Sequence, residues 1–76
     1  MYEVNIAELK KRMIDANLER VINLSARSGV DRNTLSKILN AEIKPSTSVI
    51  EKLMMALAIS PDDAGKIFFA ADLRNP

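Results

Sequence analysis

The sequence contains no cysteine and no histidine. Their absence excludes disulfide bonds, thiolate or imidazole metal sites, cysteine nucleophiles and a histidine general base. Helix packing must then supply all the stability of the chain. With 76 residues, the chain has room for a single domain, 1–76, with a modest core. Because disulfides are characteristic of oxidising compartments, their exclusion leads us to expect a cytoplasmic protein.

Long hydrophobic runs and a strong charge of one sign are also missing. No stretch approaches the roughly 20 apolar residues that cross a bilayer, and the amino terminus lacks the apolar segment of a signal peptide, so we expect no membrane partner. Eleven Lys and Arg against ten Asp and Glu give a net charge of +1. Binding to nucleic acid would therefore depend on a local arrangement of residues rather than on overall charge.

Patterns typical of catalysis are missing as well. The sequence has no Gly-rich phosphate loop and no carboxylate pair at a spacing suited to acid–base chemistry. Asp62 and Asp63 are better explained by the positive amino end of a helix. We predict that the protein is not an enzyme and uses no cofactor, metal or small-molecule ligand.

Apolar residues recur every three or four positions along most of the chain, which predicts helices and no strands. Five helices are expected, over about 6–17, 19–28, 31–40, from 47 onward, and about 61–73. Residues suited to helix capping precede four of them: Asn5, Asp31, Ser46 or Thr47, and Ser60. The expected architecture is a compact all-α domain of five short helices that cross at mixed angles.

The most informative segment is LSARSGVDRNTLSKILNAEIKPS, residues 24–46. It predicts two helices joined by a sharp turn at Gly29, a helix-turn-helix unit over about 19–40 that can press its second helix into the DNA major groove. On that second helix Leu35, Ile38 and Leu39 are expected to face inward. The residues expected to face outward and contact bases are Arg32, Asn33, Ser36 and Lys37.

Those four side chains suit the edges of base pairs. Arginine can donate two parallel bonds to guanine, asparagine can pair with adenine, serine can donate or accept, and lysine can reach guanine or phosphate. The predicted phosphate contacts are Thr34, Asn40, Lys44 and, on the preceding helix, Arg27. Residues 27–44 have a net charge of +2, which favours such contacts.

Residues 6–60 resemble the helix-turn-helix domain of the lambda-repressor and Cro-like family, also called the XRE family. The matching pieces are LSARSGV, DRNTLSKILN, KPS and VIEKLMMALAIS. The resemblance implies a compact five-helix fold, an operator in double-stranded DNA as partner, and base contacts from the same four positions of the recognition helix, 31–40.

Three positions depart from that family. A Gln is usual where Val21 stands, a charged residue where Ile22 stands, and Gly where Ala41 stands. We expect Val21 to fill the core and Ile22 to belong to a protein contact. Ala41 either adopts a left-handed backbone at a cost of about 1 kcal/mol, or the loop has another shape.

The carboxyl-terminal helix has more apolar surface than one small core needs. Phe69 and Leu73 would form an i, i+4 pair beside its inner stripe, either as additional core or as a protein interface. Two roles follow from the resemblance. One is a Cro-like repressor that binds its operator as a homodimer; the alternative is a modulator of repression, an antirepressor that binds a phage repressor protein instead of DNA.

Overall fold

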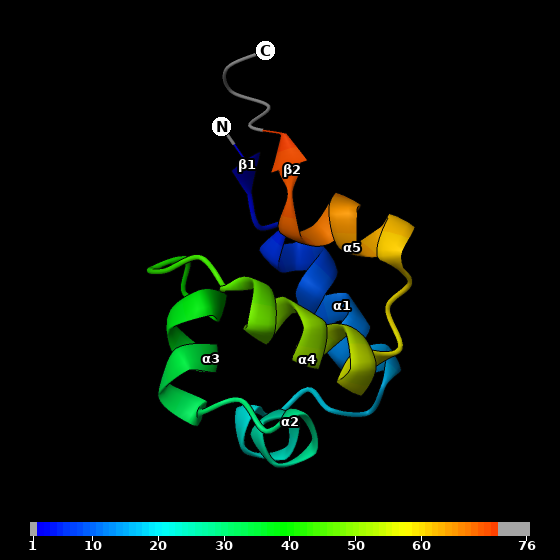
Figure 1. The fold of residues 1–76 in the computed structure, drawn as a ribbon. Helices are drawn as coiled ribbons and strands as arrows, with labels where there is room; N and C mark the ends of the chain where they lie inside the picture. The colour runs from blue at the N-terminus through cyan, green and yellow to red at the C-terminus, as the bar shows by residue number, and fades with distance from the viewer. Residues whose placement is uncertain (1, 72–76) are drawn as a thin grey trace.

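The computed structural model describes residues 2–71 and has five helices, which confirms the predicted all-α architecture (Figure 1). Its elements are, in order, β1 (Tyr2–Glu3), α1 (Ile6–Asp15), α2 (Val21–Ser28), α3 (Arg32–Leu39), α4 (Thr47–Leu57), α5 (Pro61–Phe68) and β2 (Ala70–Ala71). Within the described range, each helix is too short or too polar to cross a bilayer.

Side-chain caps start four of the helices, as predicted. Asn5 Oδ1 accepts a hydrogen bond from the backbone N–H of Glu8 at 3.1 Å, and Asp31 Oδ2 accepts from the N–H groups of Asn33 and Thr34. The hydroxyls of Ser46 and Ser60 do the same for α4 and α5. Each cap satisfies a backbone donor that has no partner inside its helix.

Three helices end on a left-handed residue other than glycine: Asn17, Ala41 and Ala58, with φ of 61°, 60° and 53°. After α3, the N–H of Ala41 donates to Ile38 O at 3.0 Å and that of Glu42 to Lys37 O at 2.8 Å, the pair of bonds of a Schellman motif. Of the two alternatives for Ala41, the structure therefore shows the strained one. Gly29, at φ 79°, ends α2 as expected.

The last helix is shorter than the periodicity predicts. α5 ends at Phe68, so the expectation of a helix over 61–73 is wrong for the described residues, and Phe69 does not lie on a helix. The chain turns into β2, which pairs antiparallel with β1. The N–H of Asn5 also donates to Ile67 O at 2.7 Å, so bonds to the amino-terminal segment replace the continuation of the helix. Leu73 lies outside the described residues.

The core is built around α4, which runs through the middle of the molecule (Figure 1). Leu53 is fully buried, and Ile50 and Leu57 are buried with it on the inner face of this helix. Leu35 and Ile38 of α3 are each 1% exposed, so the recognition helix is anchored through the face that was expected to point inward. Its opposite face remains free.

Candidate nucleic-acid interface

A short braced turn fixes the angle between α2 and α3. Ser25 Oγ donates to Val30 O at 2.6 Å, and Ser28 Oγ donates to Leu24 O at 2.7 Å while accepting from Val30 N–H. Val30 itself is buried at 4% exposure and ties the turn to the core. A Cβ built on Gly29 would meet no described atom within 4 Å, so the left-handed backbone, not space, is what requires glycine there.

The amino ends of α2 and α3 form one open notch. The residues that line it are Val21, Ile22, Asp31, Arg32, Asn33 and Ser36. Three of the four predicted base-contact residues are thus brought together, with Arg32 and Asn33 exposed and Ser36 half-buried. Lys37, the fourth, is exposed on the same helix but does not line the notch.

Asp31 gives the notch an acidic side. Its carboxylate accepts hydrogen bonds from the backbone N–H groups of Asn33 and Thr34, at 2.9 and 3.3 Å. Those N–H groups at a positive helix end would otherwise suit a phosphate. Because the carboxylate already occupies them, the amino end of α3 offers side chains rather than backbone donors to a ligand.

The predicted phosphate contacts do not all lie together. Thr34 is half-buried on α3, and Asn40 is exposed directly after it. Lys44 is exposed in the loop before α4, where its Nζ donates to Tyr2 O at 2.8 Å. Arg27 is separate: it lies about 140° around α2 from Ile22 at 100° per residue, on the side of α4 next to Lys52.

The two residues at the start of α2 differ in exposure. Val21 is half-buried and packs against the core, in agreement with its predicted role. Ile22 is 56% exposed and lines the notch beside the predicted base-contact residues, so its predicted protein contact stays a prediction. The helix begins at Val21 rather than at about Glu19, the start predicted from the sequence.

Arg20 is a functional candidate that the sequence analysis misses. It is exposed, it precedes the notch residues Val21 and Ile22, and within the described residues its side chain makes no capping hydrogen bond to α2. Its guanidinium is thus available near the positive end of a helix that has no acidic residue in its first turn. The signal in the sequence is the absence of a capping residue type just before Val21.

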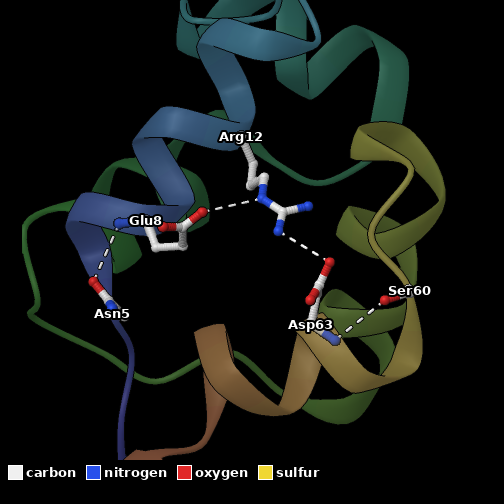
Figure 2. A network of polar contacts seen from close by, with 5 residues as sticks. All are labelled: Asn5, Glu8, Arg12, Ser60 and Asp63. Atoms are coloured by element: carbon white, nitrogen blue, oxygen red, sulfur yellow. Dashed lines mark hydrogen bonds and ion pairs between the residues drawn. The ribbon is translucent and has the colours of Figure 1, made fainter.

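Arg12, by contrast, forms two ion pairs within the scaffold. Arg12 bonds to Glu8 Oε2 through Nε at 3.1 Å and to Asp63 Oδ2 through Nη2 at 3.0 Å, joining α1 to α5 (Figure 2). The hydrogen bond from Arg12 lowers the pKa of Asp63, and the same bond raises the pKa of the guanidinium. This cation stabilises the scaffold and is not part of the notch.

The comparison with protein families agrees with this geometry. Residues 8–67 match the model of the Cro/C1-type HTH DNA-binding domain. The chain belongs to this family. The match includes α2, the braced turn, α3 and the whole notch, and it confirms the resemblance read from the sequence. No curated protein and no solved structure matches the chain. As a Cro/C1-type domain, it is a DNA-binding domain of the kind that regulates transcription.

Proposed function

We propose that this Cro/C1-type chain is a cytoplasmic, sequence-specific repressor of the Cro type that binds an operator with α3 in the major groove. The observation that supports it is the notch, in which Arg32 and Asn33 of the first turn of α3 lie together with Ser36, one turn further along. In helix-turn-helix proteins, the first residues of the recognition helix are those that contact base edges.

Each side chain has a chemical role in this proposal. Arg32 donates to O6 and N7 of a guanine, Asn33 pairs with an adenine, and Ser36 contacts a neighbouring base edge. Lys37, one turn further along the helix, reaches a guanine or a phosphate. Each bidentate pair discriminates against a wrong base by about 1–3 kcal/mol.

The phosphate contacts of the proposal are Thr34, Asn40 and Lys44, together with Arg20 at the start of α2. Arg27 is not included, because it faces the opposite side of α2. We further propose a homodimer that reads two half-sites about 10 base pairs apart. Two copies double the number of base contacts, which matters for a chain with a net charge of only +1.

The experiment starts from a random duplex library, from which the full chain selects its preferred sequence, followed by affinity measurements at several salt concentrations. Arg32→Ala should relax the preference at one base pair by about 5- to 150-fold, the equivalent of 1–3 kcal/mol. Lys44→Ala should weaken binding to every sequence and reduce the salt slope by about one. The matched control is Lys52→Ala, which removes the same charge beside Arg27 and should change neither quantity.

The outcome that contradicts this proposal is equally direct. If the full chain enriches no sequence and shifts neither random duplexes nor the DNA flanking its own gene at low salt, it does not read DNA by itself. If Arg32→Ala loses affinity without any change in base preference, Arg32 contacts DNA without regard to sequence.

A second candidate function is supported by an exposed aromatic pair. The rings of Tyr2 and Phe69 meet edge to face with centroids 6.1 Å apart, although the two residues are 63% and 50% exposed. Such apolar surface suits a protein contact, and a modulator that binds a phage repressor would use it. Co-purification with that repressor, abolished by Phe69→Asp but not by Arg32→Ala, would favour this role over direct DNA reading.

A further inference from the structure

Ile22 is the one strongly exposed apolar side chain in a notch that is otherwise polar on its open side. It is 56% exposed, whereas its neighbour Val21 is half-buried against the core. The other large exposed apolar residues among those described lie elsewhere, since none of them lines the notch: Tyr2, Ile14, Ile43, Met55 and Phe69. Ile22 therefore forms an apolar wall facing the side chains that are expected to read bases.

The backbone of α2 holds Ile22 in this position. Leu24, two residues on, is 1% exposed and lies about 160° around the helix from Ile22 at 100° per residue. With Leu24 fixed in the core, Ile22 must point outward. A β-branched side chain on a helix has one strongly preferred rotamer, so it loses little freedom when a ligand covers it.

The chemistry of the neighbouring residues favours DNA as what covers Ile22. The notch also contains Asp31, Arg32, Asn33 and Ser36, and a protein pressed over them would have to satisfy every polar group that it buries. The major groove offers polar base edges and one apolar group in the same surface, the C5-methyl of thymine. A notch with donors on one wall and an aliphatic side chain on the other matches that combination.

We propose that Ile22 contacts the C5-methyl group of a thymine and thereby selects T at one position of each half-site, next to a base pair read from α3. The inference rests on the proposed DNA-reading function and extends it. Specificity then comes from two helices: α3 supplies hydrogen bonds, and the first turn of α2 supplies an apolar contact.

The test removes the methyl group from the DNA and the side chain from the protein separately. In the selected operator each thymine is replaced in turn by uracil, which differs only in lacking the methyl group. For wild-type protein, one such replacement should weaken binding about fourfold, the equivalent of the ~0.8 kcal/mol for one buried methyl-sized group. In Ile22→Ala the same replacement should cost less than about twofold, because the methyl has lost its partner.

The matched control is Ile14→Ala, which removes an equally exposed isoleucine from α1, outside the notch. It should keep the fourfold uracil effect. The uracil series on wild-type protein needs no variant, so the absence of any uracil effect there would refute the thymine contact even if Ile22→Ala did not fold.

The failures of the two proposals can be told apart. If Arg32→Ala changes base preference but every uracil replacement has the same effect in wild type and Ile22→Ala, the thymine contact is wrong and direct DNA reading stands. If the full chain selects no sequence, both proposals fall. If Ile22→Ala leaves operator binding intact and abolishes binding to a repressor protein, Ile22 belongs to a protein interface and the thymine contact is again wrong.

Discussion

The left-handed end of α4 leads to a prediction about stability. Ala58 has φ 53° and ψ 46°, and its N–H donates to Met54 O, as does that of the buried Ile59 at 2.9 Å. A left-handed conformation costs a residue with a Cβ about 1–2 kcal/mol. Ala58→Gly removes that cost but adds conformational freedom to the unfolded chain, worth about 0.4–1 kcal/mol. The balance predicts stabilisation by about 0.5–1 kcal/mol.

The measurement is unfolding by heat and by urea, followed by circular dichroism. For a chain of this size, the gain corresponds to a rise in Tm of about 3–6 °C. The control is Ala26→Gly, an exposed position in the right-handed helix α2, where glycine should lower stability by about 1 kcal/mol. The reasoning is refuted if Ala58→Gly lowers Tm as Ala26→Gly does, since the same substitution then has the same effect in both backbone conformations.

Two further predictions concern the scaffold and the aromatic pair. Because the bond from Arg12 lowers the pKa of Asp63 in the folded state, the stability it contributes is present above the pKa of the unfolded aspartate. This stability is lost as pH falls through the lower pKa of Asp63 in the folded state. Wild type should therefore be more stable than Asp63→Asn at neutral pH, and the stabilities of the two proteins should converge below about pH 4. A constant difference down to acid pH would exclude this ion pair as the cause. Phe69→Asp should shift a homodimer toward monomer in sedimentation equilibrium while Met55→Asp does not, and an unchanged dimer would place the subunit contact elsewhere.

Local chemistry explains what the sequence could predict. The caps Asn5, Asp31 and Ser60 act on N–H groups two or three residues away, so their function is visible in a short stretch of sequence. The burial of Leu35 and Ile38 follows from the helical period alone. The predicted fold and the anchoring face of α3 are confirmed for this reason.

Contacts between distant segments explain what could not be predicted. The helical pattern of apolar residues continues in the sequence past Phe68, but α5 ends there and Ala70 and Ala71 pair with the amino-terminal strand instead. No local signal in the sequence marks a strand of two residues. The bond from Lys44 to Tyr2 joins residues that are 42 positions apart. The separation of Arg27 from the notch depends equally on which side of α2 packs beside α4.

The charge distribution links the scaffold to the proposed mode of recognition. Arg12 is paired with Glu8 and Asp63, and the carboxylate of Asp31 occupies backbone donors at the amino end of α3. Because the net charge of the chain is only +1, overall charge supplies little attraction for phosphates that acts without regard to sequence. A protein with weak non-specific binding must obtain its affinity from contacts that differ between sequences. In the proposed mode of recognition, the polar side chains of α3 and Ile22 of α2 provide such contacts, which is why we propose the notch, rather than overall charge, as the basis of function.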